Sequence, residues 1–104
     1  MMIIDIHTHC FPDQIAVYAI PKLASSAREG IKPYLDGRLD SLLKSMEKAG
    51  IGISVVQHIA TKPGQEKTIN TWAAQIQNQI GAGRIYSFGT LHPDTPDWRG
   101  ELKR

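Results

Sequence analysis

Hydrophobic residues divide the chain into short apolar runs that alternate with longer stretches of helical periodicity. The apolar runs cover residues 2–7, 51–59 and 85–91; the first is rich in isoleucine and the second in isoleucine and valine. Runs of this length are too short for ordinary helices, and β-branched residues favour an extended chain. We therefore predict three buried strands.

Two of the intervening stretches have the spacing of amphipathic helices. Residues 39–49 carry an apolar stripe of Leu39, Leu42, Leu43, Met46 and Ala49. Residues 65–80 carry a second stripe of Ile69, Trp72, Ala73, Ile76 and Ile80. We expect Asp36 or Gly37 to cap the start of the first helix and Gly50 to end it.

The stretch at residues 13–27 gives a weaker helical signal, because Pro21 lies inside it. We expect a short helix or two separate turns there, followed by a loop through Gly30 and Pro33. After the third strand, the residues from Trp98 onward have the pattern of another helix beginning.

Strands and helices alternate along the chain, and this order predicts an α/β fold with a parallel sheet and right-handed crossovers. We expect a βαβαβ unit in a single domain over residues 1–104, because a chain of 104 residues forms only one modest core. Gly81-Ala82-Gly83 follows a helix instead of opening one, so the dinucleotide-binding pattern is not met.

Composition narrows the classes of function. The net charge is only +2 and no basic stripe is present, so the sequence does not favour a nucleic-acid partner. No apolar run is long enough to span a bilayer and no secretory signal pattern is seen, so we expect a cytoplasmic location without a membrane partner. The single cysteine, Cys10, fits a reducing compartment, and we expect an unreactive, partly buried thiol.

The residues with the most chemical potential lie at the predicted carboxyl ends of the strands. All four histidines of the chain are there: His7 and His9 on the first strand, His58 on the second and His92 on the third. In parallel α/β folds the βα loops gather at this edge, and ligands bind there. The pattern therefore indicates a functional site at this edge of the sheet.

His7 and His9 are the candidate metal ligands. Alternate side chains of a regular strand share a face, so we expect Asp5, His7 and His9 to point to one side. Two imidazoles so placed can reach one ion, and neutral imidazole is a good donor to zinc and similar metals. Asp5 would then orient one of the rings from behind.

The other two histidines have open alternatives. His58 is either a further site residue or a hydrogen-bonded histidine that closes its strand. His92 precedes Pro93, which restricts its backbone to extended conformations. It either contacts a substrate or organises the loop.

Three motifs in this order resemble the N-terminal part of the amidohydrolase superfamily of metal-dependent (β/α)8 barrels. The resemblance is closest to the amidohydrolase-related, aminocarboxymuconate-semialdehyde decarboxylase-like group. Its motifs are Asp5-Ile6-His7-Thr8-His9, Met46-Glu47-Lys48-Ala49-Gly50-Ile51 with Val55-Val56, and Gly89-Thr90-Leu91-His92-Pro93. The TatD-like nucleases of the same superfamily share the first-strand histidine pair and a similar His-Pro.

The resemblance implies that residues 1–104 are the first three βα units of a TIM (β/α)8 barrel. It also implies that His7 and His9 hold a divalent metal, zinc in first place, for hydrolysis of an amide, ester or related carbonyl substrate, or for a related decarboxylation of a small molecule. Further ligands and a general base of that family have no counterparts in these residues, so we expect them to be inactive alone.

Two alternatives remain at this point. The chain is either an N-terminal fragment of a longer metal-dependent hydrolase, or a truncated, catalytically incomplete metal-binding chain. We expect the truncated chain to self-associate, because an open sheet leaves its edges uncovered. We expect a homo-oligomer or association with the missing part of a barrel. TatD-like nuclease activity is a minor alternative, which the modest charge does not favour.

Overall fold

The computed structural model describes residues 1–104 and contains three strands and five helical segments. Their bounds are β1 Ile3–Thr8, α1 Asp13–Ser26, α2 Leu39–Ala49, β2 Ile51–Gln57, α3 Glu66–Gln75, η1 Ile76–Ile80, β3 Ile85–Phe88 and α4 Trp98–Lys103. None of the helices has the length and apolar character needed to cross a membrane. The predicted alternation of strands and helices is confirmed.

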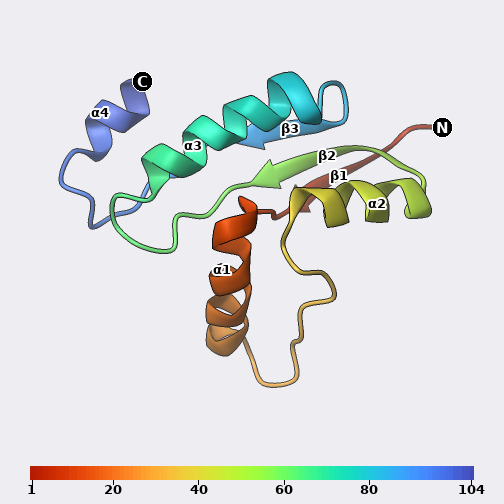
Figure 1. Ribbon diagram of the computed structural model, residues 1–104, viewed down its shortest axis with the longest axis horizontal. Helices are drawn as coiled ribbons and strands as arrows, with labels where there is room; N and C mark the ends of the chain where they lie inside the picture. The colour runs from red at the N-terminus through yellow and green to blue at the C-terminus, as the bar shows by residue number, and fades with distance from the viewer.

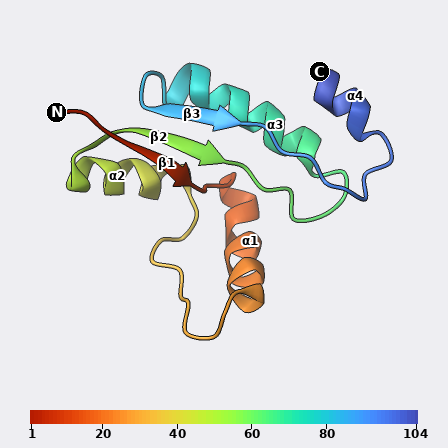
Figure 2. The same cartoon turned by 180° about the vertical axis from the view of Figure 1, so that it is seen from behind.

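The three strands form one parallel sheet in the order β1-β2-β3. The helices α2 and α3 lie on one face of this sheet, in front of it in Figure 1 and behind it in Figure 2. The opposite face carries no helix. The molecule is thus a small α/β domain of two layers, compatible with consecutive βαβ units.

Both later strands end earlier than the apolar runs predict. Strand β2 ends at Gln57 and not at Ile59, and β3 ends at Phe88 and not at Leu91. Pairing between β2 and β3 ends at Gln57 and Phe88, although apolar residues continue into the loops that follow. The apolar run therefore overestimates each strand at its carboxyl end.

The helix α2 follows its apolar stripe but starts differently from the prediction. Its N-cap is Arg38, whose extended backbone precedes Leu39, so neither Asp36 nor Gly37 is the cap. The Asp36 carboxylate instead accepts a hydrogen bond from the backbone amide of Arg38 itself, before the helix begins (3.0 Å). Gly50 ends the helix as predicted, with a left-handed φ of 73° that only glycine adopts freely.

The helix α1 is continuous through Pro21, so the predicted interruption is wrong. A proline inside a helix removes one backbone donor, but the turns before and after it keep theirs. Near the end of the helix, the hydroxyls of Ser25 and Ser26 donate to the Lys22 carbonyl (2.8 and 3.2 Å). In Figure 1, α1 projects away from the sheet.

The predicted helix at 65–80 has the expected extent but two geometries. Residues 66–75 are α-helical and Ile76–Ile80 form a π-helical turn, closed by a bond from the Gly81 amide to the Ile76 carbonyl (2.7 Å). Gly81 is needed there, because a Cβ at this position would lie 2.5 Å from Cγ1 of Ile85. This close turn sends the chain directly into β3.

The core consists of two clusters. The larger one packs the sheet against α2 and the α3–η1 segment, and contains Cys10, Leu39, Leu42, Met46, Val56, Ile76 and Ile85. The smaller one consists of Phe11, which precedes α1, and of Ala16 and Ala19 within α1. Strand β1 borders this core only at its carboxyl end, where Thr8 is buried while Ile4 and Ile6 stay exposed. The core thus packs against the carboxyl end of β1, the end that carries His7 and His9.

Candidate metal site at the carboxyl edge of the sheet

His7 and His9 bring their rings together at the end of β1. Their Nε2 atoms are 3.2 Å apart, and their ring centroids are 5.0 Å apart at an interplanar angle of 75°. Both side chains are exposed. The Nε2 atoms of the two histidines predicted as metal ligands therefore converge on one point that solvent can reach.

A backbone carbonyl orients the His9 ring. Its Nδ1 lies 2.8 Å from the carbonyl oxygen of Gln57, the last residue of β2. A carbonyl oxygen only accepts, so Nδ1 carries the proton and Nε2 of the neutral ring has a free lone pair. His7 then donates its own Nε2 proton to that lone pair. This is the tautomer of His9 that a metal ligand needs.

The spacing of the pair fits a shared tetrahedral ion. Two imidazole nitrogens bound to one tetrahedral zinc at ordinary bond lengths lie about 3.3–3.4 Å apart. The observed 3.2 Å separation of the His7 and His9 Nε2 atoms is close to this value. Binding would require His7 to take the tautomer that carries its proton on Nδ1, because this frees the lone pair of its Nε2 for the ion.

The pair alone does not complete a metal site. No group of three or more histidine, cysteine, aspartate or glutamate side chains in residues 1–104 is arranged to hold one ion. A tetrahedral ion on His7 and His9 therefore keeps two positions for water, substrate or donors from elsewhere.

Asp5 contacts the backbone of His7, not a ring. Its Oδ1 accepts a hydrogen bond from the His7 amide (3.0 Å). The register of β1 also shifts between Asp5 and Thr8, which lie opposite Ser54 and Val56 of β2. The regular alternation expected along β1 is thus interrupted, and Asp5 acts on the strand end that carries the pair.

His58 is buried beside this edge, with 6% of its surface exposed. Its Nε2 lies 2.9 Å from Oγ of Ser87, and its ring meets Trp72 edge to face at 5.7 Å. Burial, with a smaller contribution from His9, lowers its pKa from 6.5 to about 4. These contacts are those of the hydrogen-bonded histidine that closes its strand.

His92 organises the loop after β3. Its Nδ1 accepts a hydrogen bond from the Asp94 amide (3.1 Å), and its carbonyl accepts one from the Thr95 amide (3.1 Å). Of the two readings left open for this histidine, the observed contacts are those of the loop-organising one.

Cys10 follows His9 in the sequence, but its side chain lies in the core of the domain. It is 1% exposed and belongs to the larger core cluster, so it is more buried than predicted. Burial raises the pKa of its thiol to about 12. Metals bind the thiolate, which this environment disfavours.

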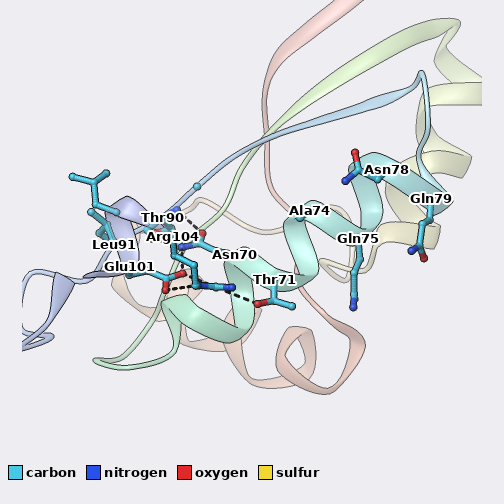
Figure 3. A pocket seen from close by; sticks show the side chains of 12 residues that line it. Asn70, Thr71, Ala74, Gln75, Asn78, Gln79, Thr90, Leu91, Glu101 and Arg104 are labelled. Carbon is cyan, nitrogen blue, oxygen red and sulfur yellow. Dashed lines mark hydrogen bonds and ion pairs between the residues drawn. The ribbon is translucent and has the colours of Figure 1, made fainter. Parts of the chain in front are cut away.

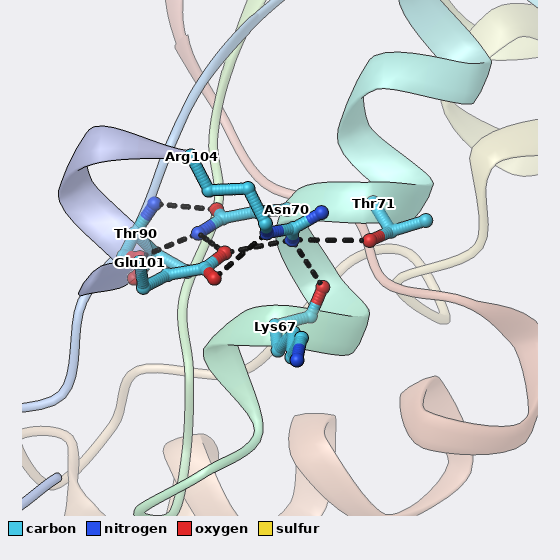
Figure 4. Close-up of polar contacts among 6 residues, drawn as sticks. All are labelled: Lys67, Asn70, Thr71, Thr90, Glu101 and Arg104. Atoms are coloured by element: carbon cyan, nitrogen blue, oxygen red, sulfur yellow. Dashed lines mark hydrogen bonds and ion pairs between the residues drawn. The ribbon is translucent and has the colours of Figure 1, made fainter. Parts of the chain in front are cut away.

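A second polar centre lies where α3, the loop after β3 and α4 meet, and no sequence pattern indicated it. The Asn70 amide donates to the Thr90 carbonyl (2.9 Å) and to Glu101 (3.0 Å), while its oxygen accepts from the Thr90 amide (2.8 Å) (Figure 4). Arg104 pairs with Glu101 and donates to Thr71. Thr90 and Glu101 lie 20 and 31 residues from Asn70 in the sequence, so only the fold brings these groups together.

This polar centre borders an open hollow of about 790 Å³ (Figure 3). Hydrogen bonds from Arg104 and Asn70 lower the pKa of Glu101 to about 2. The side chains of Asn70, Glu101 and Arg104 already have partners within the chain. The centre therefore fastens α4 to α3.

Comparison with known proteins gives no relative: no family model, no curated protein and no solved structure matches this chain.

Proposed function

We propose that this chain binds a divalent transition-metal ion, zinc in first place, through Nε2 of His7 and Nε2 of His9. The observation that carries the proposal is the convergence of these two atoms to 3.2 Å, with the opposite nitrogen of His9 held by the Gln57 carbonyl. Metal-binding histidines are typically held in this way.

We further propose that the site belongs to a metal-dependent hydrolase of the amidohydrolase type, with the three strands as the first units of a (β/α)8 barrel. Support comes from the three ordered motifs and from neighbouring parallel strands with helices on one face only. In such barrels the helices lie outside and the catalytic residues follow the carboxyl ends of the strands.

A divalent ion held by the pair would supply Lewis acidity toward water and toward the carbonyl of a small amide, ester or related substrate, or of a substrate that is decarboxylated. The chain's own part is to present two neutral imidazoles in a fixed geometry. Asp5 and Gln57 hold the strand end that carries them.

The test is titration of purified, metal-free protein with zinc by calorimetry, alongside His7→Ala/His9→Ala. The matched control is His92→Ala, which removes an imidazole from the same edge but not from the pair. We expect binding by the wild type and by His92→Ala and its loss in the double variant. Equal zinc binding by all three proteins would overturn the proposal.

A further inference from the structure

Gln57 makes two connections to β1, one on each side of His7. Its backbone carbonyl accepts from Nδ1 of His9 (2.8 Å), and its side-chain amide donates to the Ile6 carbonyl (3.1 Å). Gln57 thus contacts the segment that carries His7 and His9 with both its backbone and its side chain.

The side-chain connection stands where the regular ladder is interrupted. Strands β1 and β2 shift register between Asp5 and Thr8, so Ile6 and His7 have no paired residue in β2. A carbonyl left in such a gap needs another donor, and the Gln57 amide supplies it to Ile6. The Gln57 side chain thus adds a connection between the strands at the point where their pairing is irregular.

The residues around Gln57 hold it rigidly. Its backbone pairs with Phe88 of β3, and the next residue is the buried His58, fixed by Ser87 and Trp72. Thr8 adds a hydrogen bond from its hydroxyl to the Val55 carbonyl (2.9 Å). The carbonyl that meets His9 is therefore fixed by the core, and the amide that meets Ile6 extends from the same fixed point.

We propose that Gln57 is the positioning residue of the metal site: it holds the end of β1 through its amide so that its carbonyl selects the His9 tautomer whose Nε2 faces His7. This inference rests on the proposed metal binding. It adds that the pair is preorganised before any metal arrives, and that the residue responsible is a glutamine on the adjacent strand.

The experiment compares Gln57→Met with wild type and with Gln75→Met. Methionine keeps the length and flexibility of glutamine but has no amide donor. Gln75 is an exposed glutamine of α3 and serves as the matched control. Zinc affinity is measured by calorimetry, the His9 tautomer in metal-free protein by ¹⁵N chemical shifts of the ring nitrogens, and folding by far-UV circular dichroism.

We expect Gln57→Met to weaken zinc binding by roughly tenfold or more, as loss of a contact behind a metal ligand typically does. We also expect it to mix the two His9 tautomers, while the spectrum of the fold and the binding by Gln75→Met stay unchanged. Wild-type affinity together with an unchanged Nδ1-protonated His9 in Gln57→Met would overturn the inference.

The outcomes separate this inference from the proposed function. If wild-type protein fails to bind zinc, the metal proposal fails, yet the tautomer measurement still tests whether Gln57 orients His9. If wild type binds and Gln57→Met binds equally with the same tautomer, only the positioning role fails. Should Gln57→Met not fold, Gln57→Glu keeps the shape and removes the donor, and its His9 tautomer decides.

Discussion

The four histidines of this chain differ in what their ring nitrogens contact, and this difference separates their roles. Those of His7 and His9 face each other and solvent, and one is oriented by a carbonyl. His58 is enclosed between Ser87 and Trp72. A ring that keeps an accessible lone pair can take a metal, whereas an enclosed neutral ring stabilises the fold only while it stays uncharged.

The enclosed ring gives a prediction on pH and stability. The pKa of His58 is lowered from 6.5 to about 4, so the folded state favours the neutral form. Its contribution is complete above about pH 6.5 and is lost as the pH falls toward 4, because the unfolded chain takes up the proton first. We expect a loss on the order of 3 kcal/mol over this range.

Urea unfolding between pH 7 and pH 4.5, in the presence of a chelator, measures this loss. In His58→Gln the free energy of unfolding should depend less steeply on pH than in wild type, since the titrating group is absent. The same slope in both proteins would show that His58 is not the group responsible.

The buried thiol gives a second prediction at this scale. Because Cys10 is 1% exposed and burial raises its pKa to about 12, it should react with a thiol reagent far more slowly than a free thiol at pH 8. Addition of urea above the unfolding midpoint should release full reactivity. Rapid reaction of the native protein would contradict the burial of Cys10.

At the scale of elements, the turn after η1 depends on the absence of a side chain. A Cβ at Gly81 would lie 2.5 Å from Ile85 Cγ1 and 2.9 Å from the Ile76 carbonyl oxygen, and both atoms belong to buried residues. By contrast, a Cβ at Gly89 would meet nothing closer than 3.4 Å. The π-helical turn and β3 are therefore joined at a point that cannot expand.

We expect Gly81→Ala to destabilise the fold by about 1–3 kcal/mol, the usual cost of overpacking. Gly89→Ala is the matched control, and it should change the free energy of unfolding by less than about 0.5 kcal/mol. Thermal and urea unfolding of both variants measures the difference. Equal stability of the two would mean that the turn relaxes without cost.

At the scale of the whole molecule, the sheet is covered on one face only. Just 18 of 104 residues are buried, whereas Ile3, Ile4 and Ile6 of β1 and Tyr86 and Phe88 of β3 are 48–72% exposed. An edge strand with apolar side chains and unpaired backbone groups readily pairs with another chain. We propose that, in solutions of this chain by itself, two copies associate and cover this surface.

Light scattering after size exclusion tests this at several concentrations. We expect a mass above that of the 11.5 kDa monomer, with a shift toward the monomer in Ile4→Lys/Ile6→Lys. Val17→Lys, at an exposed position on α1, is the control and should behave like wild type. A monomer at every concentration, with a cooperative melting transition, would contradict the proposal.

What could be predicted from the sequence was local in character. The strands, α2, α3 and the Gly50 stop follow from hydrophobic period and glycine chemistry, which act over a few residues. Strand ends and the course of α1 through Pro21 could not be predicted, because pairing partners and packing decide them. The same division applies to the site.

The sequence by itself determined that His7 and His9 lie together at the end of a strand, since one residue separates them. Only the tertiary structure decided that Gln57, 48 residues beyond His9, selects the His9 tautomer, that His58 is enclosed, and that Asn70 meets Glu101. Contacts between distant segments depend on the register and burial of the assembled sheet, and no local pattern of residues encodes them.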